Sequence, residues 1–137
     1  MVPLRVVWDT NVFISTILLH GRSTRLAHHL MDGRMTLLVS EPILEEYFGV
    51  AIRPRFGTTQ REVRALLEGL VPWMRLIHPK SLRNLSLSDA SDLKFLECAA
   101  AGGASHLITG DHALIRLGRC RGVAIISSTS FLKILDA

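Results

Sequence analysis

Residues 4–9 of the chain are Leu4-Arg5-Val6-Val7-Trp8-Asp9, a short apolar run that stops at a carboxylate. A run of this length, with adjacent valines and no glycine or proline, is typical of a buried strand. Four comparable runs follow along the chain. The expected strands are residues 4–8, 35–39, 74–77, 105–108 and 123–126.

Helix signals separate these runs. Ser40 is a candidate cap with Pro42 in the first turn, and Gly102-Gly103 fits the end of a later helix. Strands that alternate with helices and are too apolar to face water predict an α/β fold, in which one parallel sheet is covered on both faces. The expected helices are residues 11–20, a helix capped by Ser23 and ending at 31, one capped by Ser40 and ending at 52, one beginning at Thr58 or Thr59 and ending at 70, and residues 88–101, 112–117 and 129–135.

Length and composition narrow the class of protein. A chain of 137 residues favours one domain over residues 1–137. Hydrophobic residues make up 48% and charged residues 20%, which predicts a packed globular core and not a disordered chain. Aromatic residues, at 6%, are too few for a protein that grips bases mainly by stacking. The net charge of +4 suits a polyanionic partner without requiring one.

Two cysteines, Cys98 and Cys120, cannot form a disulfide framework or a four-ligand zinc site, so we expect free thiols in a reducing compartment. Asp9 interrupts the N-terminal apolar run, which argues against a signal peptide. The longest uncharged stretch, residues 98–110, is too short and too rich in glycine to span a bilayer. These features predict a cytoplasmic protein with no membrane segment.

Two aspartates follow expected strands directly. Asp9 ends the first strand, with Asn11 two residues further on, and Asp111 follows Thr109-Gly110 after the fourth. In parallel sheets the functional crevice lies outside the carboxyl ends of the strands. A carboxylate there could face a metal ion or a phosphate, and the Thr109 hydroxyl could orient it. Either aspartate could instead simply cap the next helix.

Asp92 lies in the helix expected over residues 88–101. On a helical wheel it shares a face with apolar residues such as Phe95, whereas Lys94 and Glu97 point away. A carboxylate on a core-directed face is costly unless it is paired or bound to a metal ion. The alternative is that Asp89 caps this helix and Asp92 occupies its third position, where the helix dipole favours an acid.

A fourth carboxylate comes from the helix after Ser40, where periodicity barely chooses between Glu45 and Glu46. With Asp9, Asp92 and Asp111, one of these glutamates could converge on one end of the sheet. Crowded carboxylates remain ionised only if a cation neutralises them, and an all-oxygen cluster suits Mg²⁺ or Mn²⁺ better than zinc. Such ions support phosphodiester hydrolysis.

Six segments together resemble the motifs of one family and follow its order along nearly the whole chain: Val6–Ser15, Val39–Tyr47, Ile52–Phe56, Ser88–Ala99, Leu107–Asp111 and Ile126–Leu132. The chain resembles the PIN-domain family, in particular the VapC-like ribonucleases that are the toxins of bacterial type II toxin–antitoxin pairs. Two positions differ from the family pattern. The family commonly has an acid two places after the last motif aspartate, where this chain has Ala113, and more acid at the positions of Ala90-Ser91.

The resemblance implies a three-layer α/β/α fold with a five-stranded parallel sheet. It also implies an Mg²⁺- or Mn²⁺-dependent endoribonuclease that cleaves RNA, binds a small antitoxin protein and forms a homodimer. It assigns the functional glutamate to Glu46. The residues that it implies as catalytic and metal-binding are Asp9, Glu46, Asp92 and Asp111, with Asn11, Thr109, Asp89 and Ser127 in support.

Two other functions remain open. A phosphatase with an aspartate nucleophile also has an Asp at the end of its first strand, but that mechanism needs a second acid where Asn11 stands and a lysine between Lys94 and Asp111, which is absent. A catalytically weakened module that binds RNA or a protein partner is compatible with Ala113. Six arginines flank the expected cleft and could bind phosphate or remain solvated: Arg22, Arg25, Arg53, Arg55, Arg61 and Arg64.

Overall fold

A computed structural model describes residues 2–19, 24–80 and 92–136 of the chain. A mixed sheet forms its centre, in the strand order β3-β2-β1-β4-β6-β5. The sequence prediction of a sheet between two helical layers is confirmed. The strands are β1 (Leu4–Trp8), β2 (Met35–Val39), β3 (Met74–Leu76), β4 (His106–Ile108), β5 (Arg119–Cys120) and β6 (Val123–Ile126).

The prediction of five parallel strands is wrong in one respect, because the sheet has a sixth strand. β5 pairs with β6 in the antiparallel direction, while the other four pairings are parallel. Arg121 and Gly122 connect β5 to β6, both with positive φ, as a tight hairpin turn requires. A strand of two residues is too short to leave an apolar pattern in the sequence.

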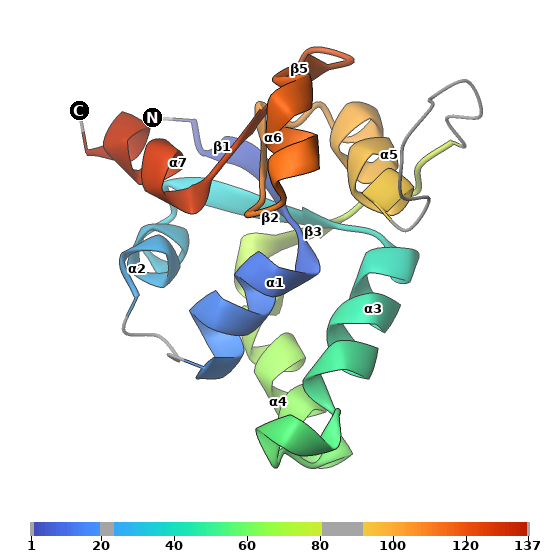
Figure 1. Cartoon of the computed structure of the whole chain (residues 1–137). Helices are drawn as coiled ribbons and strands as arrows, with labels where there is room; N and C mark the ends of the chain where they lie inside the picture. The colour runs from blue at the N-terminus through green and yellow to red at the C-terminus, as the bar shows by residue number, and fades with distance from the viewer. Residues whose placement is uncertain (1, 20–23, 81–91, 137) are drawn as a thin grey trace.

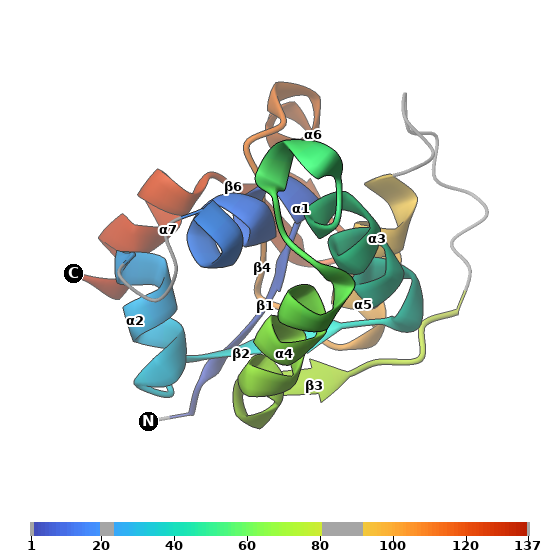
Figure 2. The same cartoon turned by 90° about the horizontal axis from the view of Figure 1, so that it is seen from below.

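Helices cover both faces of the sheet. Figures 1 and 2 show α5 and α6 on one face and α1 to α4 on the other, and α7 lies against α2. Parallel strands need crossovers of one hand, so strand order decides which face each helix covers. The helices are α1 (Thr10–Phe13), α2 (Arg25–Met31), α3 (Glu41–Ala51), α4 (Gln60–Leu70), α5 (Leu93–Ala101), α6 (His112–Leu117) and α7 (Ser128–Leu135).

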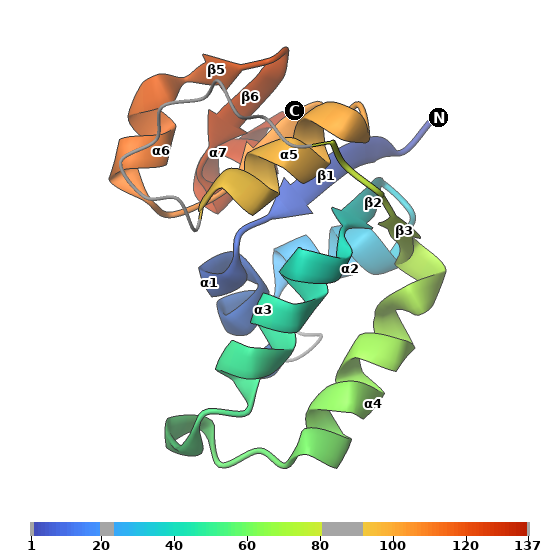
Figure 3. The same ribbon diagram turned by 90° about the vertical axis from the view of Figure 1, so that its right-hand side faces the viewer.

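Most helix predictions hold to within a few residues. Ser40 and Thr59 cap α3 and α4 as expected, but Thr24 caps α2 in place of the predicted Ser23, which lies outside the described residues. The helix expected over 11–20 begins one residue earlier and continues beyond α1 as a π-helix, Ile14–Leu19. Figure 3 shows α3 and α4 side by side, joined at their far ends through a 3₁₀ turn at Pro54–Phe56.

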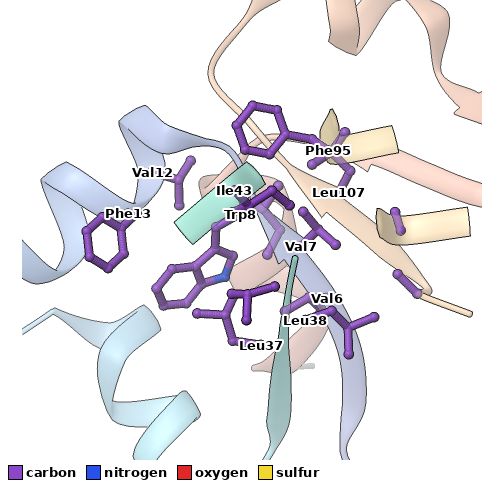
Figure 4. Close-up of a cluster of buried hydrophobic side chains, with 14 of the residues drawn as sticks. Val6, Val7, Trp8, Val12, Phe13, Leu37, Leu38, Ile43, Phe95 and Leu107 are labelled. Atoms are coloured by element: carbon purple, nitrogen blue, oxygen red, sulfur yellow. The ribbon is translucent and has the colours of Figure 1, made fainter. Parts of the chain in front are cut away.

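The core surrounds β1. Val6, Val7 and Trp8 are fully buried, so successive side chains on both faces of the strand are covered. Figure 4 shows them between Leu37 of β2 and Leu107 of β4, with the helix residues Val12, Phe13, Ile43 and Phe95 on the other side of Trp8 from Leu37. This packing fixes the position of the carboxyl end of β1. Asp9 follows directly after that end.

Both cysteines are free thiols, as expected. Burial raises the pKa of Cys98 to about 12, so this thiol is not a nucleophile at neutral pH. Across the described residues, the helices are too short or too polar for any of them to cross a membrane.

Candidate functional site

The ends of β1 and β4 bring two aspartates together. These strands pair in parallel with Trp8 opposite Ile108, and the Asp9 amide donates to the Ile108 carbonyl at 3.0 Å. Asp9 and Asp111 therefore lie at the same edge of the sheet. α3 and α5 contribute Glu46 and Asp92 to this edge. One pocket of about 330 Å³ is lined by Asp9, Thr10, Asn11, Glu46, Val50, Arg53, Arg55, Asp92, Phe95 and Asp111.

Asp9 is the most enclosed of the four carboxylates, with 7% of its surface exposed. Its Oδ1 accepts from the Val12 amide at 2.9 Å and caps α1, and its Oδ2 accepts from the Thr109 hydroxyl. Burial raises the pKa of Asp9, against these hydrogen bonds, and the nearby charge of Asp111 raises it further. Asp9 is thus both a helix cap and a pocket residue, and its environment favours a cation.

Thr109 connects the two strand-end aspartates. Its fully buried hydroxyl donates to Asp9, and its oxygen accepts from the Asp111 amide at 3.0 Å. Asp111 itself is exposed, and its Oδ1 accepts from the amides of Ala113 and Leu114 at the start of α6. The capping interpretation of Asp111 is therefore correct, and the same side chain lines the pocket.

Glu46 faces the pocket, whereas Glu45 is exposed on another side of α3. The Oε2 of Glu46 accepts from the Thr10 hydroxyl, and the Oε1 of Glu46 accepts from Lys94 Nζ at 2.6 Å. Lys94, which the helical wheel places away from the apolar face, pairs with Glu46 of α3 and so connects α5 to a residue that lines the pocket.

Asp92 precedes α5 and is half-buried. α5 itself begins at Leu93, and the capping alternative depends on residues before Asp92 that lie outside the described part of the chain. Asp89, the residue expected to cap the helix, lies outside the described residues. α5 packs against β1, β2 and β4, which fixes the position of Asp92 at the edge of the sheet.

Not every expected residue reaches the pocket. Ser127, expected in support, caps α7 by accepting from the Ser130 amide at 3.1 Å and does not line the pocket. Ala113 is also absent from its lining. Asn11 lines it, as expected.

Arg53 and Arg55 are the cationic residues that line the pocket. Both are exposed at the turn between α3 and α4, where the Arg55 guanidinium lies 4.7 Å from the centre of the Phe56 ring. Over residues 2–19, 24–80 and 92–136, neither forms an ion pair with an acid. By contrast, Arg25 pairs with Asp136 on the far side of α2. The two pocket arginines are therefore available to an external anion.

Tyr47 is a residue that sequence reasoning missed. It follows Glu46, is fully buried and stacks on Phe13 with ring centroids 4.1 Å apart. Its hydroxyl donates to the Trp8 carbonyl at 2.6 Å. This bond joins the residue next to Glu46 to the residue next to Asp9, and so it helps to fix the position of α3 relative to the end of β1.

Tyr47→Phe is expected to lower the free energy of unfolding by about 1–3 kcal/mol, because it leaves a buried carbonyl without its donor. The stacking on Phe13 is retained, so the change reports the hydrogen bond alone. Chemical denaturation measures it. A free energy of unfolding equal to that of the parent would mean that the Trp8 carbonyl does not need this hydroxyl.

The donor set of the pocket fits a hard divalent cation: four carboxylates from four segments, one of them buried and raised in pKa. As the side chains stand, no three His, Cys, Asp or Glu residues in the described part of the chain are grouped as they would be around a bound ion. Glu46 explains part of this, because Lys94 and Thr10 hold both of its oxygens.

Comparisons with known proteins support the fold, and the matched regions include the pocket residues. Fifteen chains of solved structures match. One belongs to the crystal structure of VapBC2 from Rickettsia felis bound to a DNA fragment from their promoter, with a TM-score of 0.61, 18% identity, and coverage of 89% of this chain and 97% of that chain. No curated protein matches. The sequence model described as the PIN domain matches residues 5–113, a range that contains all four carboxylates. The chain belongs to the PIN-domain family.

Proposed function

We propose that this PIN domain is a divalent-metal-dependent endoribonuclease and the toxin of a toxin–antitoxin pair. PIN domains are generally nucleases and typically use divalent metal ions. The observation that carries the proposal is the pocket itself, in which four carboxylates and two arginines, which have no acidic partner among the described residues, line one space of about 330 Å³. Carboxylates suit the cation that the chemistry needs, and arginines suit the phosphates of the substrate.

We assign a different role in hydrolysis to each group of pocket residues. Asp9, Glu46, Asp92 and Asp111 would hold Mg²⁺ or Mn²⁺, which supplies charge neutralisation and Lewis-acid activation for phosphodiester hydrolysis. Thr109 holds the Asp9 carboxylate in place through its hydroxyl, and Thr10 does the same for Glu46. Arg53 and Arg55 would bind phosphates of the strand on either side of the scissile bond.

The test is cleavage of an RNA by the purified chain with Mg²⁺, with Mn²⁺ and with EDTA. We expect cleavage with either ion and none with EDTA. An activity that survives EDTA would contradict the metal requirement. A DNA strand of the same sequence tests the choice of RNA.

A second candidate is a PIN-fold module that binds RNA or a protein partner without cleaving it. The Lys94–Glu46 pair and the alanine at position 113 favour it, since both reduce the negative charge available to a cation. RNA binding without cleavage under any metal condition would support this candidate over the nuclease.

The proposed partner is a small antitoxin protein, and the fold likeness to the VapBC2 structure supports it. We also propose a homodimer and a cytoplasmic location. Co-purification with the product of a neighbouring gene tests the antitoxin, and sedimentation of the purified chain tests the dimer. Growth arrest by the parent, relieved by that product, tests the toxin.

Arg53→Gln together with Arg55→Gln is expected to weaken binding of a fluorescent single-stranded RNA. Log affinity falls with log salt, and each lost phosphate contact makes this fall shallower by about 0.7, so removing both arginines should reduce the magnitude of the slope by roughly 1.4. Fluorescence anisotropy over a salt series measures this slope, with EDTA present to prevent cleavage.

The matched control is Arg75→Gln with Arg119→Gln, which removes two exposed charges from opposite edges of the sheet. The control should retain the parent's slope apart from the general effect of net charge. Equal losses in the two double variants would mean that the pocket arginines make no specific phosphate contact.

A further inference from the structure

A lysine that does not itself line the pocket pairs with Glu46, one of the carboxylates that do. Lys94 Nζ donates to Glu46 Oε1 at 2.6 Å, and both side chains are 25% exposed, so the pair is substantially withdrawn from water. Lys94 is the second residue of α5. The positive end of the helix dipole lies there and disfavours a cation. The ammonium is therefore held by Glu46 against the preference of its own helix.

Glu46 has both oxygens engaged. Oε1 accepts from Lys94 and Oε2 accepts from the Thr10 hydroxyl, which is itself on a buried residue. A carboxylate can accept further interactions, but an ammonium already neutralises its charge. A divalent ion that approaches Glu46 meets a positive charge at contact distance from the ligand it needs.

We infer that Lys94 is an internal counter-ion that competes with the divalent cation for Glu46. In the metal-free protein the lysine neutralises the glutamate and keeps it from repelling the aspartates. Metal binding then requires the ammonium to leave Glu46 Oε1, so Lys94 sets the metal concentration at which the pocket fills. This inference rests on the proposed metal dependence and concerns its regulation by one residue.

The test is a metal titration followed by melting temperature, with no nucleic acid present. We expect Lys94→Met to lower the Mn²⁺ concentration for half-maximal stabilisation by about tenfold or more, because it removes a unit charge that repels the ion at short range. Without metal, the same variant should melt below the parent, since Glu46 loses its partner. Added Mn²⁺ should restore that loss.

Three further variants isolate the cause. Lys133→Met removes the same charge from an exposed position on α7 and should leave the half-maximal concentration unchanged. Lys94→Arg keeps the charge and should titrate like the parent. Lys94→Gln can still donate to Glu46 without a charge, so it tests the inference even if the methionine variant fails to fold.

The outcomes separate this inference from the proposed function. Metal stabilisation of the parent with an unchanged or raised half-maximal concentration in Lys94→Met and Lys94→Gln would overturn the competition and leave the metal site standing. Stabilisation of the variants but not of the parent would support the competition in its strongest form. Stabilisation of neither would overturn the metal site, and the inference with it.

Discussion

Asp9→Asn is expected to abolish RNA cleavage while the domain remains folded and at least as stable as the parent. Asp9 is the most buried of the pocket carboxylates, and its hydrogen bonds to Val12 and Thr109 fix its direction. Residues that merely orient metal ligands typically contribute about 10- to 100-fold in activity or affinity, so loss of a ligand should exceed that range. Single-turnover cleavage of a labelled RNA with Mn²⁺ measures the loss.

The stability part of this expectation follows from the pKa. Burial raises the pKa of Asp9, so the unfolded chain releases this proton at a lower pH than the folded chain does. Ionisation therefore lowers stability as the pH rises between the two pKa values, and the full cost is present above the folded-state pKa. Asparagine does not ionise, and it still caps a helix. The advantage of the variant should be greatest at neutral pH and disappear in acid.

Thermal melting in EDTA across a pH series checks this second part, because no metal ion then offsets the charge. A folded variant that cleaves RNA at the parent's rate would reduce Asp9 to a helix cap. A variant that is less stable than the parent at neutral pH would mean that the hydrogen bonds of the carboxylate outweigh its burial.

The fold was largely predictable because its central strands, β1 and β2, are mostly buried and leave short apolar runs in the sequence. β1, β2 and β6 have the predicted bounds, and β3 and β4 differ by one residue each, since a continuous apolar run ends where the chain leaves the core. The antiparallel β5 was not predictable from a two-residue pattern. Nor was the π-helix after α1, because an apolar stretch has no periodicity that separates 3.6 from more residues per turn.

The site was predictable where backbone topology alone determines it. The carboxyl ends of parallel strands lie at one edge of the sheet, so Asp9 and Asp111 could be expected at the same edge, but the pairing of β1 with β4 that makes them neighbours comes from the structure. The same reasoning fails for Ser127, which also follows a strand beside β4 but whose hydroxyl serves its own helix. A position directly after a strand fixes where the backbone lies, but the side chain there can hydrogen-bond either into the pocket or to its own helix.

Contacts between residues of different helices and strands could not be predicted from the sequence. Periodicity did not separate Glu46 from Glu45, and only the family resemblance favoured Glu46. The contacts of Tyr47 with Trp8 and of Lys94 with Glu46 join positions 39 and 48 residues apart. Neither is implied by a local pattern, since each depends on how α3 packs against β1 and α5.

Mn²⁺ is expected to raise the melting temperature of the parent, and Asp92→Ala is expected to abolish the rise. An ion that binds only the folded state stabilises it by about 2.7 kcal/mol at a hundred times its dissociation constant. In a domain of this size that corresponds to a rise on the order of 5–10 °C. Asp92 is half-buried at the start of α5 and lines the pocket from that side, whereas Asp9 and Asp111 line it from the strand ends. Loss of Asp92 should therefore remove one whole side of the ligand set.

Asp32→Ala is the matched control, because it removes an exposed carboxylate at the end of α2 and should retain the full rise. The comparison uses the change in melting temperature between EDTA and Mn²⁺ for each variant, so that a difference in intrinsic stability cancels. A parent indifferent to millimolar Mn²⁺ would count against any metal site in the pocket. A rise in Asp92→Ala equal to the parent's would mean that the ion is held from the strand ends alone, by Asp9 and Asp111, and that α5 contributes only the wall of the pocket.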